Sequence, residues 1–130
     1  MLKVEIVTPK GLYASLDVES LTVKLSSGYR TILNGHIPLI GSLAYAPMHV
    51  VKDGKTEYFA LHGGALNVKK DKVVIIANSI EAKADIDLKR AQDAKKRAED
   101  RLSSKDPNID VKRAELALIR ALTRIETASK

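Results

Sequence analysis

The residues of this 130-residue chain best suited to recognise a ligand are arginines and aspartates in a repeated run. Residues 86–91 read Ile-Asp-Leu-Lys-Arg-Ala, and residues 109–114 read Ile-Asp-Val-Lys-Arg-Ala. The match continues at the same offset with two pairs of arginines: Arg97 and Arg120, then Arg101 and Arg124. Six of the seven arginines lie in residues 85–130. Because a guanidinium suits two-point contact with carboxylate or phosphate, we expect anion recognition in this part of the chain.

Two explanations of the repeat remain open. An aspartate at the start of a helix accepts hydrogen bonds from free backbone N–H groups, and an arginine three residues later can pair with it. The spacing also places three arginines of each copy on one helix face: Arg90, Arg97 and Arg101, then Arg113, Arg120 and Arg124. Two such rows on paired helices could grip a polyphosphate or an acidic helix. The ordinary alternative is a solvated polar face.

The elements that must position these arginines are two helices. From Asp85 onward Gly is absent, and the strong helix formers Ala, Lys, Arg and Glu dominate. Two apolar stripes at helical spacing predict the buried faces: Leu88, Ala91, Ala94, Ala98 and Leu102, then Val111, Ala114, Leu118, Ala121, Ile125 and Ala128. Between them, residues 103–108 include Pro107, where a helix cannot continue. Residues 85–130 are therefore predicted to form a two-helix antiparallel hairpin.

Residues 1–84 instead show the period of β-strands. Apolar and polar residues alternate in two clear stretches: Leu2, Val4 and Ile6, then Leu21, Val23 and Leu25. Turn signals recur at short spacing, and we interpret the pair Gly63-Gly64 as a hairpin turn. All five aromatic residues lie in this half, so we expect the main core here. The predicted fold is a β-sandwich or flattened barrel over residues 1–84, followed by the helical hairpin over residues 85–130.

The predicted helices have a narrow, Ala-rich apolar face without aromatic residues. At about 0.8 kcal/mol per buried CH₂ group, alanine contributes little stabilisation compared with leucine or phenylalanine. We therefore expect a hairpin that can leave the sandwich and open without unfolding the sandwich core.

Several kinds of site are disfavoured by the composition. The chain has no cysteine, and its three histidines lack the spacing of metal ligands, so we predict no metal site. Neither a phosphate-binding Walker loop nor a serine nucleophile elbow is present, and no catalytic residue is predicted. The net charge of +6 would suit nucleic acid, but the arginine-rich part lacks aromatic residues for base stacking. No apolar stretch approaches the roughly 18 residues that span a bilayer, so we expect a soluble protein that reaches a membrane only through partners.

The order of several short motifs resembles the epsilon subunit of bacterial proton-translocating ATP synthases, which is called delta in mitochondria. The motifs cover nearly the whole chain: Val7-Thr8-Pro9 with Gly11, Ser27-Gly28, Ile32-Leu33, Gly35-His36-Ile37-Pro38-Leu39, Gly63-Gly64 and both copies of the repeat. The resemblance implies a non-catalytic subunit of the central stalk, at the cytoplasmic face of the bacterial plasma membrane. It implies docking of the sandwich on the gamma subunit and the c-subunit ring. The hairpin would permit ATP hydrolysis when folded down and block it when extended toward the catalytic beta subunit.

In some members of this family, mostly from bacilli, the folded hairpin binds ATP, which the resemblance implies as a regulatory ligand here; no cofactor is required. The matching residues are Glu81, Ile86, Asp87, Arg90, Ala91, Arg120 and Arg124. The arginines would hold the phosphates, and Glu81 and Asp87 would meet base or ribose donors or orient an arginine. The second copy of the repeat would serve only to cap its helix.

The chain departs from the family pattern in places. It has Thr31 where Gly is usual and Asn34 where Pro is usual, and Ala65 and Asn67 replace Phe and Glu. The first two lie in a segment expected at the interface with the ring and gamma: Arg30, Thr31, Asn34 and His36. Two other functions stay open: a free-standing ATP-binding sensor, and an unrelated module that binds an acidic ligand or nucleic acid.

Overall fold

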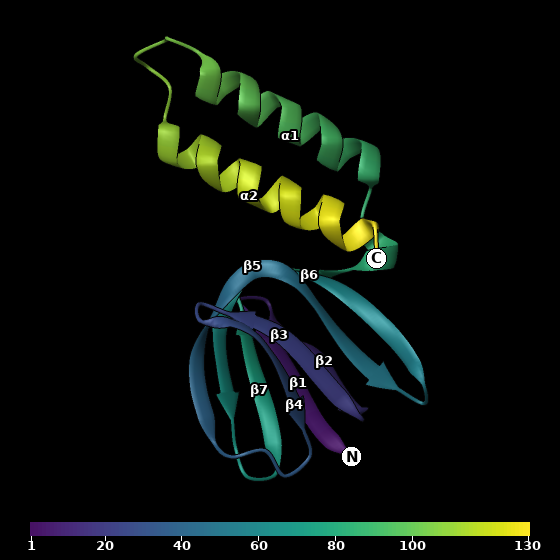
Figure 1. Cartoon of the computed structure of the whole chain (residues 1–130). Coiled ribbons are helices and arrows are strands. Elements are labelled where there is room, and N and C mark those ends of the chain that lie inside the picture. The colour runs from purple at the N-terminus through teal and green to yellow at the C-terminus, as the bar shows by residue number, and fades with distance from the viewer.

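The computed structural model describes all 130 residues, which form eight strands, one short 3-10 turn and two helices (Figure 1). The strands are β1 (Leu2–Thr8), β2 (Gly11–Val18), β3 (Ser20–Leu25), β4 (Gly28–Leu33), β5 (Leu39–Lys52), β6 (Lys55–Val68), β7 (Lys72–Ala77) and β8 (Ile80–Ala82). The turn η1 (Lys83–Asp85) leads into the helices α1 (Leu88–Ser103) and α2 (Val111–Ala128). The predicted order of a β domain followed by a helical hairpin is confirmed.

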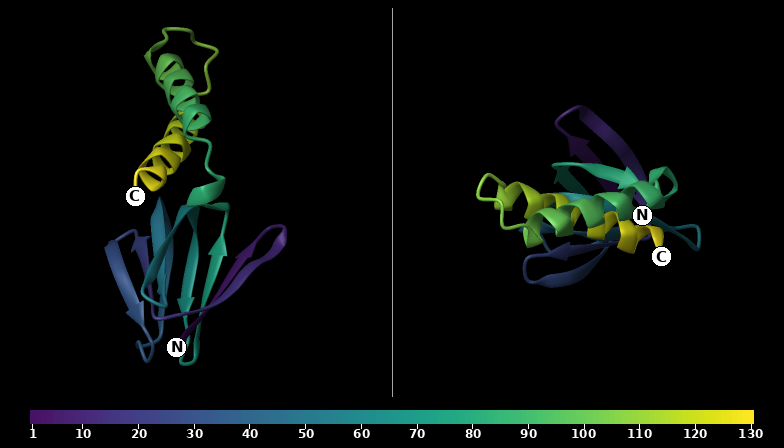
Figure 2. Two further views of the ribbon diagram at one scale, coloured as in Figure 1. Left: turned by 90° about the vertical axis from the view of Figure 1, so that its right-hand side faces the viewer. Right: turned by 90° about the horizontal axis from the view of Figure 1, so that it is seen from above.

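The strands form one sheet in the order β2-β1-β7-β6-β5-β3-β4, with β8 paired to β6. Only β1 and β7 run parallel. The two longest strands, β5 and β6, have 14 residues each and run through both layers of the sandwich. The sheet folds over along these two strands, and the side view shows the strands splayed in two layers below the helices (Figure 2).

The core lies between the two layers and follows the predicted alternation. The inward residues of β1 and β3 are buried, as the period of two requires: Leu2, Val4, Ile6, Leu21, Val23 and Leu25. They pack with apolar side chains of β5, β6 and β7, so one continuous core supports the whole β domain.

The pair Gly63-Gly64 is not a hairpin turn, which corrects our interpretation of that signal. Both glycines lie inside β6, at the point where this strand changes partner from β8 to β7. Both have positive φ, and a Cβ atom at Gly64 would lie 2.0 Å from the carbonyl oxygen of Ile76. Glycine is therefore required by the close approach of two strands.

The helical hairpin forms as predicted, with the same cap on each helix. The Asp87 carboxylate accepts a hydrogen bond from the Arg90 backbone N–H, and Asp110 accepts one from Arg113, both at 3.1 Å. The buried alanines of the two stripes are Ala91, Ala98, Ala114 and Ala121. The first stripe residues, Leu88 and Val111, are exposed, contrary to the prediction. Each is the first residue of its helix, and the side chain of a helical residue tilts toward the N-terminus of the helix.

The hairpin packs on the sandwich mainly through α2. Figure 1 shows α2 between α1 and the sandwich, and α2 contacts β5 and β6. Thr123 and Thr127 are buried on the face of α2 opposite the alanine stripe, and each hydroxyl donates to a carbonyl oxygen of its own helix. Arg124 of α2 donates a side-chain hydrogen bond to Glu81, and Lys83 of η1 donates one to the carbonyl of Lys130, two residues beyond α2. We propose the domain boundary after residue 84, inside η1.

Candidate functional site

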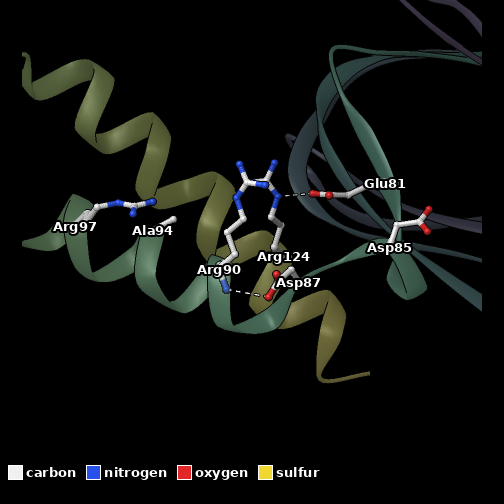
Figure 3. A pocket seen from close by; sticks show the side chains of 8 residues that line it. Glu81, Asp85, Asp87, Arg90, Ala94, Arg97 and Arg124 are labelled. Atoms are coloured by element: carbon white, nitrogen blue, oxygen red, sulfur yellow. Dashed lines mark hydrogen bonds and ion pairs between the residues drawn. The ribbon is translucent and has the colours of Figure 1, made fainter.

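A cavity of about 320 Å³ lies where the hairpin meets the sandwich (Figure 3). Its lining comes from β8, from η1 and from both helices: Glu81, Asp85, Asp87, Arg90, Ala91, Ala94, Arg97 and Arg124. Small-molecule sites begin at about this size, and three basic side chains in the lining suit an anionic ligand. We call this space the junction cavity.

Three separate elements place the charged groups of the junction cavity. Glu81 is held by the short edge strand β8, which pairs with residues 59–61 of β6. Asp87 is fixed as the cap of α1, which sets Arg90 one turn into that helix. Arg124 comes from the last turns of α2 and, in Figure 3, points to the same side of the cavity as Arg90. The cavity therefore exists only while the hairpin lies on the sandwich.

Glu81 is the electrostatic centre of the junction cavity. Its Oε1 accepts hydrogen bonds from the Arg124 side chain and from Nε2 of His62, which lies 3.2 Å away. Burial alone would raise the pKa of Glu81, but these two hydrogen bonds and the nearby charges outweigh it and hold the pKa below its usual range. Glu81 is thus ionised at neutral pH and ties β8 to α2.

Two arginines of the junction cavity carry charge without an ion-pair partner. Arg90 and Arg97 both line it, and neither has a carboxylate within 4.0 Å. The Asp87 carboxylate is engaged with the backbone of Arg90 rather than with its guanidinium. Two unpaired guanidinium groups on one helix face are suited to hold a phosphate chain. No group of three or more histidine or acidic side chains is placed to hold a metal ion.

The structure brings together five of the seven residues predicted for the nucleotide: Glu81, Asp87, Arg90, Ala91 and Arg124. Ile86 is half-buried beside η1, and Arg120 is exposed one turn before Arg124; neither lines the junction cavity. Three lining residues were not predicted for it: Asp85, Ala94 and Arg97. The position of Arg97 in the arginine row, seven residues after Arg90, was the signal that could have identified it.

The second copy of the repeat lines a separate cavity of about 330 Å³ at the far end of the hairpin. Its lining repeats the pattern of the first, with Asp110, Arg113 and Ala114 from α2 and Arg101 from α1. No residue of the sandwich takes part, so the counterpart of Glu81 is missing. The capping role predicted for Asp110 is confirmed by its hydrogen bond to Arg113.

The four residues predicted to meet partners lie on β4 and in the turn that follows it. Arg30, Thr31 and Asn34 are exposed, and His36 is half-buried with Nδ1 at 2.7 Å from the Ile37 carbonyl oxygen. Sequence reasoning missed the apolar character of this end, where the most exposed large side chains are Leu33, Ile37 and Ile40. We call these three residues the end patch.

A second exposed apolar surface crosses the outer face of the sheet. Leu12 pairs with Val7, Val7 with Ile76, and Ile76 with Ala65, so these four residues form one row over β2, β1, β7 and β6. Leu12 is 65% and Ile76 is 54% exposed, although both stand in regular strands. We call this surface the outer row. Contiguous exposed apolar surface of this kind marks a site of protein association.

The comparison with protein families divides the chain as the fold does. The family model described as "ATP synthase, Delta/Epsilon chain, beta-sandwich domain" matches residues 1–83. The model described as "ATP synthase, Delta/Epsilon chain, long alpha-helix domain" matches residues 84–129. The chain belongs to the ATP synthase delta/epsilon family. The predicted family is thereby confirmed.

Individual relatives of this delta/epsilon chain are named ATP synthase epsilon chain. The relative from Bacillus licheniformis is 46% identical over 127 residues, which cover 98% of this chain and 97% of that protein. The relative from Bacillus subtilis is 43% identical over 129 residues, which cover 99% and 98%. These matches confirm the prediction of a non-catalytic subunit of an ATP synthase. They favour it over a free-standing sensor or an unrelated binding module.

Two solved assemblies contain chains of the same fold as this delta/epsilon chain. One is a mitochondrial ATP synthase of Euglena gracilis (OSCP, F1 and c-ring), with a TM-score of 0.85, 20% identity and coverage of 99% of this chain and 81% of that chain. The other, from the central stalk and c-ring of the Tetrahymena thermophila enzyme, has a TM-score of 0.60, 14% identity and coverage of 98% and 93%. At these identities the likeness establishes the fold. Neither helix of this delta/epsilon chain is long and apolar enough to cross a bilayer.

Proposed function

We propose that this chain is a central-stalk subunit that joins the gamma subunit to the c-subunit ring and restrains ATP hydrolysis by movement of its hairpin. Family membership supports the subunit role. The observation that carries the regulatory role is a single cavity built from the sandwich and from both helices. A ligand in that cavity would contact the sandwich and both helices at once, and it would lose this site when the hairpin leaves the sandwich.

ATP is the regulatory ligand we propose for the junction cavity. Arg90 and Arg97 are unpaired and would hold the phosphates, while Glu81 and Asp87 would accept hydrogen bonds from the base or the ribose. Arg124 would turn from Glu81 toward the phosphates or stay as the bridge between β8 and α2. No further cofactor is part of the proposal, and the nucleotide is bound rather than hydrolysed.

ATP would act by shifting the hairpin equilibrium toward the docked arrangement. A ligand that binds only one of two states stabilises that state in proportion to its concentration over its dissociation constant. The hairpin suits this control because few hydrogen bonds hold it, and the face of α2 toward the sandwich buries two threonines rather than large apolar side chains. When ATP falls, the released hairpin would extend along gamma, and its arginine rows would meet acidic surface of the catalytic beta subunit.

The sandwich would dock through its two exposed apolar surfaces, the outer row and the end patch. Both lie away from the hairpin, so docking and hairpin movement do not compete for the same surface. The proposed partners are gamma and the c-subunit ring, with Arg30, Thr31, Asn34 and His36 at the edge of the end patch. This arrangement would hold the chain peripherally at the cytoplasmic face of the bacterial plasma membrane.

Co-purification with the gamma subunit tests the docking part. The variants Ile76→Asp in the outer row and Ile37→Asp in the end patch place a carboxylate in a surface that binding would bury. Because an unpaired buried charge costs several kcal/mol, we expect at least one of them to lower recovery with gamma by tenfold or more. Leu122→Asp, at an exposed apolar position on the hairpin, is the control and should be recovered normally. Normal recovery of both sandwich variants would contradict the docking surfaces.

A further inference from the structure

One buried histidine lies directly behind the junction cavity and has no role in the proposed function. His62 belongs to β6 and is 1% exposed. Its Nε2 lies 3.2 Å from Oε1 of Glu81, and its ring lies 6.1 Å from the ring of Tyr45 on β5. Its other nitrogen, Nδ1, is buried and has no hydrogen-bond partner.

These contacts define the protonation state of His62 in the docked arrangement. An ionised carboxylate only accepts hydrogen bonds, so Nε2 must carry the proton that it shares with Glu81. Nδ1 is then the bare nitrogen of a neutral ring. A second proton would create a buried N–H group at Nδ1 without an acceptor, and a buried unpaired donor is unfavourable.

The charges that face His62 come from two elements. Glu81 on β8 stabilises a positive ring, whereas Arg120 and Arg124 on α2 oppose it; from β5, Tyr45 presents a neutral phenol. Burial is the largest effect and lowers the pKa of His62, the two arginines lower it further, and Glu81 only partly compensates. Both arginines belong to the helix that leaves when the hairpin opens, so part of this effect belongs to docking itself.

We propose that His62 makes docking of the hairpin dependent on pH: the neutral ring holds Glu81 toward Arg124 and favours the docked hairpin, and the protonated ring favours release. Acidification would thus act in the direction opposite to ATP. His62 is a positioning residue in this account, because it acts on the hairpin through Glu81.

The direction of the pH effect follows from proton linkage. With the hairpin released, His62 returns toward its ordinary pKa of 6.5, and with the hairpin docked its pKa is lower. The released form therefore binds more protons, so docking is fully favoured above pH 6.5 and weakens as the pH falls below it. The loss levels off below the docked pKa. One linked proton changes the docking equilibrium by at most about tenfold per pH unit.

A second histidine must be separated from His62 in any test. His49 is half-buried, and its pKa is lowered first by burial and then by Lys130 at the end of α2. It would contribute in the same direction. Glu126 of α2 lines the same cavity as His49, but no side-chain hydrogen bond joins the two as one joins His62 to Glu81, so we assign His49 the smaller part.

The hairpin can be observed directly because the chain has no cysteine. Ser27→Cys in the turn before β4 and Lys105→Cys in the turn between the helices are both exposed and accept a fluorophore pair for energy transfer. We call this doubly labelled protein the hairpin reporter. Without nucleotide, we expect its docked fraction to fall between pH 7.5 and pH 5.5. His62→Gln, which keeps an N–H donor but cannot titrate, should lose more than half of this change, and His49→Gln should lose less than half.

A measurement on the unmodified chain covers the case in which the Gln variant does not fold. The ¹⁵N chemical shifts of the imidazole should show a neutral ring protonated at Nε2 and a midpoint below pH 6.5. Protonation at Nδ1, a midpoint above 6.5, or the full pH response in the His62→Gln hairpin reporter would overturn the proposal. A hairpin reporter that is released at pH 7.5, or that does not respond to pH, would overturn it as well.

The role of His62 rests on the hairpin movement of the proposed function. An ATP titration of the unlabelled chain at pH 7.5 and pH 5.8 extends the test to the junction cavity, and only this arm rests on the proposed nucleotide site. We expect a several-fold weaker dissociation constant at the lower pH in the wild-type chain and a smaller difference in His62→Gln. Absence of any ATP binding would contradict the nucleotide proposal alone, since the reporter and ¹⁵N measurements use no nucleotide. ATP binding with the same pH dependence in both chains would contradict the role of His62.

Discussion

Glu81 is the residue that joins the sandwich to the hairpin by a side-chain ion pair. It stands on the last strand of the sandwich, accepts from His62 behind it and from Arg124 above it, and lines the junction cavity. One carboxylate thus takes part in hairpin docking, in the proposed nucleotide site and in the proposed response to pH.

Replacing Glu81 by glutamine tests this role. Glutamine keeps the shape of the side chain but removes the charge that pairs with Arg124, in a pair that is only partly exposed. We expect docking to weaken by about 1 kcal/mol, which is roughly a fivefold fall in the docking equilibrium of the hairpin reporter. Glu5→Gln is the matched control, since Glu5 pairs with Lys72 inside the sandwich at 3.7 Å. An equal effect of both changes would mean that Glu81 acts through sandwich stability.

For single residues, the sequence indicated which arginines line the junction cavity better than it indicated the side chains that contact them. Glu81, Asp87 and Arg90 could be assigned because they stand in one motif or directly before it. His62 could not be assigned, because its importance depends on β6 and β8 pairing so that His62 and Glu81 meet across 19 residues. A lone histidine in a strand gives no sequence signal of that contact.

Helix α2 is the element that lies between α1 and the sandwich. One face carries the alanines that pack on α1, and the opposite face carries Thr123 and Thr127 toward the sandwich. Each threonine hydroxyl donates its hydrogen bond within α2, so these hydrogen bonds would persist if α2 left the sandwich. The alanine face stays covered by α1 when the hairpin moves as a unit.

Amide hydrogen exchange distinguishes this element from the sandwich. The hairpin buries small side chains such as Ala98 and Ala121, whereas the sandwich core buries larger ones such as Ile6 and Leu61. Because buried apolar area sets most of the local stability, we expect the hairpin amides to exchange at least tenfold faster than those of β1 and β6. Uniformly high protection across both parts would contradict a hairpin that opens independently.

Periodicity predicted the helices and strands well where one face of the element is buried and the opposite face is exposed to solvent. The alternation in β1 and β3 and the helical stripes led to the observed strands and helices. It failed at Gly63-Gly64, because two adjacent glycines signal a turn locally, whereas here they allow β6 to bend against β7. It also missed the threonine face of α2, since a polar residue buried against another domain looks like a solvated one.

The molecule as a whole combines a β domain with a large core and a helical hairpin that packs on it mainly through one helix, which we propose as the docking body and the sensor. The β domain carries the large apolar core and two exposed apolar surfaces, while the hairpin carries six of the seven arginines. The resemblance to ATP synthase epsilon subunits predicted this division, and the family match supports it. The docked position of the hairpin was beyond sequence reasoning, because its contacts join residues that are far apart in the chain.

Control of the hairpin by ATP is tested most directly by titrating the isolated chain with ATP while the signal of the hairpin reporter and the melting temperature are followed. We expect ATP at a hundred times its dissociation constant to add about 2.7 kcal/mol to the docked, folded state and to raise the docked fraction. GTP and a single-stranded oligonucleotide should not do so. Arg113→Ala, with the same helix cap as Arg90 but in the other cavity, should respond like the wild-type chain. Arg90→Ala should fold normally and show no response, and an undiminished ATP effect in Arg90→Ala would contradict the account.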